Sequence, residues 1–147
     1  MSRLLLIAVA VLTLAFAPAP LPRRASSRTD DNQRIQGVWV LTEVGGQART
    51  GNDLDRWVFG TGKLEIRICG RSYPYHWRYA IDPRAAPRAL DVRYSPDGGE
   101  GYGLKGVYSL ARDTLVITYT AAVNERPKRI DQKDEKTVTL RFRREGR

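Results

Sequence analysis

The alternation of apolar and polar residues constrains the fold of this chain more than any other feature. In residues 63–69, for example, Leu64, Ile66 and Ile68 alternate with charged residues. Such a period of two is typical of a strand with one buried and one exposed face. The same pattern predicts eight strands: Gly37–Val44, Arg56–Phe59, Lys63–Cys69, Tyr75–Ile81, Ala89–Tyr94, Leu104–Leu110, Thr114–Thr120 and Thr137–Arg143.

The connections between these segments indicate how the strands are arranged. Turn sequences such as Gly45-Gly46 and Gly60-Thr61-Gly62 separate them, and no segment has a convincing helical period. One-sided alternation favours an antiparallel sheet around one core, and eight strands suffice to close it. We therefore predict an all-β fold with a single antiparallel, roughly eight-stranded barrel; a β-sandwich is the alternative.

The N-terminus has the layout of a secretory signal. A short positive start, Met1-Ser2-Arg3, precedes the uncharged run Leu4 to Ala17, which ends in small residues and proline. The run is shorter than the roughly 20 residues of a transmembrane helix. Pro18 is unfavourable for cleavage directly before it, so an uncleaved anchor remains an alternative to a cleaved signal.

These features divide the chain into three parts. We predict a signal peptide or N-terminal anchor in residues 1–25, a flexible linker in residues 26–34 and the barrel domain in residues 35–145. The protein is then exported to the periplasm or beyond the cell. Contact with a membrane is expected only through the N-terminal segment, if that segment is retained.

The charge of the chain favours anionic partners. The net charge is +9, with 25 basic and 16 acidic residues. A basic protein is attracted to anionic envelope surfaces, although the charges here are dispersed along the sequence. We expect no nucleic-acid partner for an exported protein.

Catalytic and metal-binding patterns are missing from the sequence. His76 is the single histidine and Cys69 the single cysteine, too few for a typical zinc site. Nothing in the spacing suggests a Ser-His-Asp triad or a phosphate-binding glycine loop. We therefore predict a protein that is not an enzyme, with no metal and no cofactor, and interpret Cys69 as a free cysteine in a strand.

Two features of the first and last strands resemble the lipocalin and wider calycin pattern. Gly37-Val38-Trp39 opens the first strand, and arginines lie on the last one. In that family the tryptophan closes one end of the barrel and an arginine packs across its ring, a cation-π contact. The resemblance implies that Gly37 and Trp39 close the barrel here, together with Arg141 or Arg143.

A longer series of motifs resembles a family of small exported bacterial domains of unknown function, abundant in planctomycetes and described as lipocalin-like. The series departs from the family pattern at Thr118 and after Arg126-Pro127. The resemblance implies the fold and export but no activity. The matching pieces are Ile35–Trp39, Tyr79–Pro83 with Pro87, Leu90-Asp91, Lys105–Leu110, Asp113–Leu115 and Arg126-Pro127.

Three charged residues of these motifs have structural interpretations. Asp82 precedes a proline in a turn, and Asp113 ends a turn where its side chain can bond backbone amides. Arg126 is expected to clamp a loop by bonding a carboxylate or carbonyl groups; anion binding is the alternative.

Aromatic residues provide the hypothesis about function. Trp77 and Tyr79 share one face of a strand, and with Tyr108 they are candidates for lining a cavity that takes a small apolar or amphipathic ligand. A filled core is the alternative use of these rings. We therefore expect non-enzymatic ligand binding, or alternatively a structural or interaction domain of the cell envelope that uses its basic outer surface.

Overall fold

The computed structural model describes residues 31–51, 54–73, 77–95, 103–120 and 125–146. The predicted signal segment, residues 1–25, lies outside these residues, and so does His76. The elements in chain order are α2 (Asp31–Arg34), β1 (Gly37–Val44), β2 (Gln47–Ala48), β3 (Arg56–Phe59), β4 (Lys63–Ile68), β5 (Arg71–Ser72), β6 (Trp77–Asp82), β7 (Ala89–Tyr94), β8 (Gly103–Leu110), β9 (Thr114–Thr120) and β10 (Thr137–Arg144).

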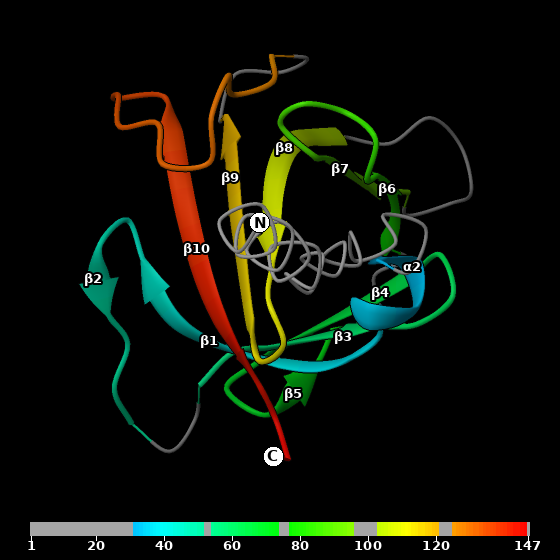
Figure 1. Ribbon diagram of the computed structural model, residues 1–147. Coiled ribbons are helices and arrows are strands. Elements are labelled where there is room, and N and C mark those ends of the chain that lie inside the picture. The colour runs from blue at the N-terminus through cyan, green and yellow to red at the C-terminus, as the bar shows by residue number, and fades with distance from the viewer. Residues whose placement is uncertain (1–30, 52–53, 74–76, 96–102, 121–124, 147) are drawn as a thin grey trace, which may run out of the picture.

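The strands form one antiparallel sheet that closes on itself (Figure 1). The order is β10-β9-β8-β7-β6-β4-β3-β1, and β10 also pairs with β1. This pairing makes a closed eight-stranded barrel, which confirms the predicted fold class and excludes the sandwich. The two-residue strands β2 and β5 extend β1 and β4 as short hairpins.

The register brings apolar residues together inside the barrel. Leu115 and Ile117 of β9 lie opposite Phe142 and Leu140 of β10, and all four are buried. Cross-strand partners point to the same face of a sheet, so these side chains share the interior. Burying a large apolar side chain contributes about 1.5–3 kcal/mol, and this core is therefore the main source of stability.

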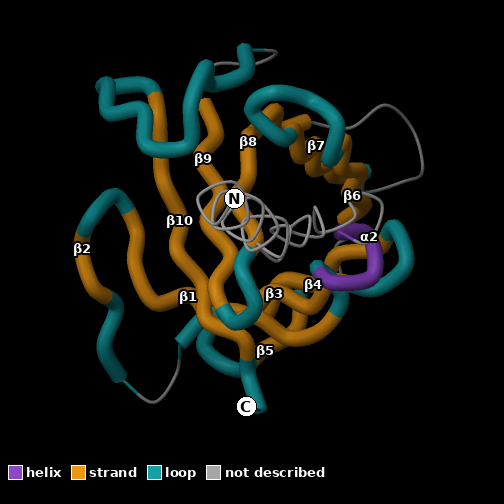
Figure 2. The backbone as a smooth tube through the Cα atoms, viewed as in Figure 1, coloured by secondary structure: helices purple, strands orange, loops and turns teal. Residues whose placement is uncertain are grey.

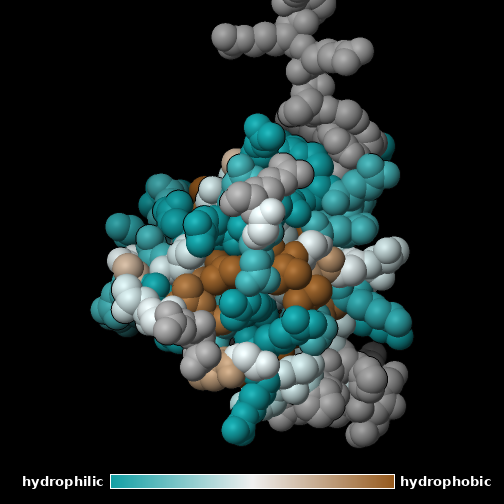
Figure 3. Space-filling model, turned by 90° about the horizontal axis from the view of Figure 1, so that it is seen from below, coloured by the Kyte–Doolittle hydropathy of each residue, from teal (hydrophilic) through white to brown (hydrophobic). Residues whose placement is uncertain are grey.

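The outer face of the barrel is mixed in character. Val38 of β1 and Val58 of β3 are paired across the strands on the outward side, and both are half-buried. Figure 3 shows the molecule from below, with apolar surface gathered in the middle of the face and hydrophilic side chains around it.

Two segments differ from the sequence-based expectation. Residues 31–34 of the predicted linker form helix α2, with Asp31 buried, because contacts with distant residues hold them. In Figure 2, α2 is the purple segment among the orange strands. Cys69 does not lie in a strand: β4 ends at Ile68, and Cys69 is exposed in the following turn with a left-handed φ of 50°.

The barrel end next to α2 is closed around Trp39. Its ring is fully buried, and its indole N–H donates to the Ile35 carbonyl at 2.7 Å. Arg144, the cross-strand partner of Trp39, places its guanidinium carbon 4.2 Å from the ring centroid. Arg144 also donates to the carbonyls of Gln36, at 2.8 Å, and of Arg34. One side chain therefore covers the ring and holds the C-terminal side of α2.

Gly37 makes room for this arginine. Its φ is +121°, which L side chains rarely adopt, and an added Cβ would lie 2.9 Å from Nη1 of Arg144. The glycine at the start of β1 is thus required by both its backbone angle and its neighbour.

The identity of the arginine corrects our expectation. The resemblance implied Arg141 or Arg143 over the ring, whereas Arg144 occupies that position. Arg144 has the inward phase of Leu140 and Phe142, while Arg141 points outward to Glu43, at 3.4 Å, and Arg143 is exposed. Side chains alternate between the two faces of a strand, so Arg141 and Arg143 point away from the interior and cannot cover the Trp39 ring.

Replacing this arginine should weaken the whole fold. We expect Arg144→Gln to lower the free energy of unfolding by about 2 kcal/mol, because it loses the cation-π contact and two hydrogen bonds. The adjacent Arg143→Gln should stay within about 0.5 kcal/mol of the wild type. Urea denaturation of both variants measures the difference, and equal losses would refute the role given to Arg144.

Candidate functional site

A buried carboxylate joins α2 to the barrel wall. Asp31 is 1% exposed; its Oδ2 accepts hydrogen bonds from Tyr108 Oη at 2.8 Å and from Arg88 Nη1 at 3.0 Å. Arg34 Nη1 donates to Oδ1 at 3.3 Å. A buried charge needs such partners, since desolvation alone is costly. The cluster fixes α2 against β8 and the loop before β7, and thereby seals this end of the barrel.

The hydroxyl of Tyr108 is therefore already hydrogen-bonded within the protein. Burial, followed by the hydrogen bond to Asp31, raises the pKa of Tyr108 well above its usual value. The hydroxyl stays protonated and donates to the carboxylate. Of the predicted ligand-lining residues, Tyr108 lies in the sealed part of the barrel.

The other two predicted lining residues lie on β6. Tyr79 donates its hydroxyl to the Gly60 carbonyl at 2.6 Å, and its ring meets Phe59 edge-on with centroids 4.9 Å apart. Trp77 packs against Tyr94 at 4.9 Å. The indole nitrogen of Trp77 is buried, and no described residue accepts a hydrogen bond from it. This N–H group is therefore unsatisfied among the described residues.

The strand ends opposite α2 contribute a set of half-buried apolar side chains. All of them pack against the core, yet none is fully covered. By contrast, Trp39, Leu115 and Phe142 near α2 are at most 1% exposed. We call the half-buried set the mouth ring; it comprises Val44, Ile66, Trp77, Leu104, Tyr119 and Val138.

The barrel wall has the fewest cross-strand residue pairs beside Trp77. β4 and β6 are paired only through Lys63 with Arg78 and Leu64 with Trp77, after which β4 turns to β5. The inward residues of β6 are accordingly half-buried along the whole strand.

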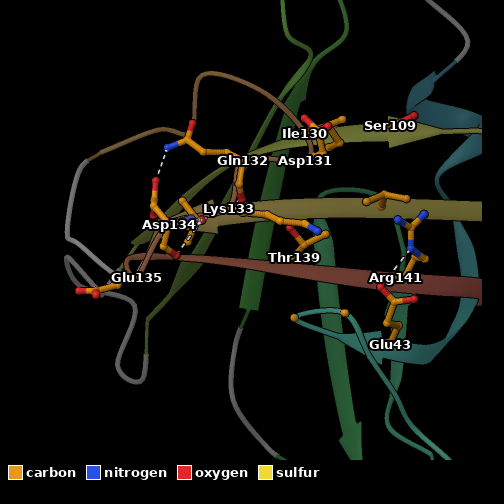
Figure 4. Close-up of a pocket in the computed structure, with 14 residues that line it drawn as sticks. Glu43, Ser109, Ile130, Asp131, Gln132, Lys133, Asp134, Glu135, Thr139 and Arg141 are labelled. Atoms are coloured by element: carbon orange, nitrogen blue, oxygen red, sulfur yellow. Dashed lines mark hydrogen bonds and ion pairs between the residues drawn. The ribbon is translucent and has the colours of Figure 1, made fainter.

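A separate outer cavity lies on the outside of the barrel. It has a volume of about 790 Å³ and is bounded by the outward faces of β8–β10, by the loop 130–135 and by Glu43 with Gly45 and Gly46. Figure 4 shows Lys133 extending toward Thr139 across this space. The side chains that the cavity presents there are largely polar, and it contains none of the three predicted lining residues.

Internal interactions already occupy several charges of the outer cavity. Arg141 pairs with Glu43 at 3.4 Å, and Gln132 donates to Asp134 at 2.6 Å (Figure 4). The hydrogen bond from Gln132, with others from Thr137 and the backbone, lowers the pKa of Asp134. No sequence motif predicted the cavity, because it forms only when the charged loop folds over the sheet.

The motif residues have structural partners. Arg126 donates to Asp91 Oδ1 at 2.7 Å and to the Gly106 carbonyl at 2.5 Å, the geometry of a clamp on the loop after β9. Asp82 accepts the backbone N–H groups of Arg84 and Ala85 within its turn. The backbone carbonyl of Asp113 accepts the N–H of Arg144 at 3.0 Å.

Comparisons with known proteins give no relative: no family model, no curated protein and no solved structure matches the chain significantly. The resemblance to the planctomycete family therefore stays a prediction. In the described ranges, no group of three or more His, Cys, Asp or Glu residues is placed to hold a metal ion. The helical residues of those ranges also include no apolar helix of membrane-spanning length.

Three tyrosines that are wholly or partly buried make the stability of the fold depend on pH. Burial raises the pKa of Tyr108, Tyr79 and Tyr119 in the folded state. The stability that they contribute is complete below the unfolded tyrosine pKa of about 10 and is lost as the pH rises through the folded values. We expect the free energy of unfolding to fall above about pH 10, and less steeply in Tyr108→Phe.

Urea denaturation between about pH 8 and pH 11 measures this slope. The wild type, measured in parallel, is the reference. A Tyr108→Phe slope identical to that of the wild type would contradict the role of the buried hydroxyl.

Proposed function

We propose that this protein is an exported, non-enzymatic binding domain that takes a small apolar or amphipathic molecule at the mouth ring. One observation carries the proposal: the inward side chains are sealed from solvent around Trp39, yet half-buried on most strands at the opposite end. Partly exposed apolar side chains gain free energy when a ligand covers them.

The unpartnered indole of Trp77 favours a ligand with a polar group. A buried N–H without an acceptor costs about 1–3 kcal/mol. A carbonyl, hydroxyl or carboxylate oxygen on the ligand would satisfy it, while the apolar part of the ligand covers Ile66 and Leu104. This combination points to an amphipathic molecule.

The buried polar groups support binding over catalysis. Asp31 and Tyr108 bond each other and Arg88 at the sealed end, so neither is presented to the mouth ring. Their arrangement stabilises the barrel, and neither group is available to a ligand at the mouth ring.

The protein isolated from its own cells should carry its ligand. We expect native mass spectrometry of the full chain to show a stoichiometric adduct of small mass that is lost on denaturation, and solvent extraction to yield an apolar or amphipathic compound. A native mass without any adduct, unchanged after incubation with a lipid extract of the cell envelope, would contradict the proposal.

Two valines provide a matched test of the binding position. Val138 and Val58 are both half-buried strand residues, but Val138 points inward at the mouth ring and Val58 points outward on β3. We expect Val138→Asp to weaken binding of the extracted compound at least about tenfold, since it places a charge against the apolar part. Val58→Asp should leave the affinity unchanged.

Trp77→Phe tests the polar contact separately. It keeps an aromatic ring and removes the indole N–H, so it should weaken binding of the extracted compound by about five- to tenfold, the worth of one hydrogen bond. An analogue that lacks the oxygen substituent should bind both forms equally.

In the valine test, equal losses of affinity in Val138→Asp and Val58→Asp would place the ligand elsewhere.

A further inference from the structure

Three cationic side chains form a row on the outer wall of the barrel. Lys63 of β4 lies opposite Arg78 of β6, and Arg78 lies opposite Arg93 of β7. All three are exposed and have the outward phase of their strands. Neighbouring strands are about 4.8 Å apart, and like charges directly opposite each other destabilise a sheet. This arrangement, the cation row, therefore carries a cost in the free protein.

Nearby acids do not relieve this repulsion. Glu65 and Asp91 lie two positions from Lys63 and Arg93 on the same outward faces. Glu65 is held by Arg67, at 2.8 and 3.2 Å, and Asp91 by Arg126 at 2.7 Å. Within the described part of the chain, no member of the cation row has an ion pair.

We propose that the cation row binds a linear polyanion, specifically an acidic polysaccharide. Charges aligned across three strands match a partner whose charges also lie in a line, and binding removes the repulsion among them. The site is independent of the mouth ring, because the outward and inward faces alternate along each strand.

The surroundings of the row favour a polysaccharide over a single-stranded nucleic acid. Proteins that bind single strands stack the bases on aromatic side chains. The described outward neighbours on these strands are Glu65, Ala80 and Asp91, and none is aromatic. The exposed apolar residues Ile68 and Tyr73, which would suit a lipid surface, flank the β4–β5 hairpin instead of the row.

Binding of the full chain to polygalacturonate oligomers tests the proposal. The triple variant Lys63→Gln, Arg78→Gln, Arg93→Gln should bind about tenfold more weakly, with a shallower dependence on salt. The matched control, Arg84→Gln, Arg112→Gln, Lys128→Gln, removes three exposed cations elsewhere and lowers the net charge equally. It should lose less than about twofold.

Equal losses in the two triple variants would overturn the proposal in favour of net charge alone. Single-stranded DNA of the same charge should bind more weakly than polygalacturonate; equal or tighter binding of the DNA would overturn the polysaccharide assignment. Neutral dextran should not bind.

Thermal unfolding without ligand provides a second readout. Removing the in-register repulsion should raise Tm of the row variant by about 3 °C, while Tm of the control variant should not rise. A row variant with unchanged or lowered Tm would mean that the three charges are already compensated, and the proposal would fail.

Discussion

The barrel depends on how the Trp39 ring is held. Its N–H is bonded to Ile35, its face is covered by Arg144, and Arg144 in turn bonds the carbonyls at the end of α2. The other side of α2 is fixed through Asp31, whose carboxylate is shared by two arginines and Tyr108. Removing one partner from such a buried charge typically costs about 3–5 kcal/mol. Strands β1, β8 and β10 are thus joined by one connected set of contacts.

These contacts are concentrated at one end of the barrel, and the proposed ligand site lies at the other end. The same strands that bury Phe142 and Leu115 near α2 end in half-buried Val138 and Tyr119 at the mouth ring. The period of two then gives each strand a second surface, because outward residues are independent of the core. An apolar inner site and a charged outer site can therefore coexist on one small barrel.

The sequence predicted what depends on local pattern and missed what depends on distant partners. The eight long strands follow from alternation, and the structure agrees with them to within two residues where it describes them. Helix α2 has no apolar period, and Asp31 is stabilised by partners 57 and 77 positions away. Arg144 could have been predicted from the sequence, because it lies two residues after Phe142 and therefore points to the same face of the strand. The cation row could not be predicted from the sequence, because it depends on the register between strands, which no single segment determines.

Hydrogen exchange of the backbone amides tests the central claim, a sealed end and a receptive end, most directly. Amides of Trp39, Leu115 and Phe142 should exchange only through global unfolding. Those of Val44, Leu104 and Val138 should exchange through local opening, at least about 100-fold faster. Equal protection at both ends, or faster exchange around Trp39, would contradict the account.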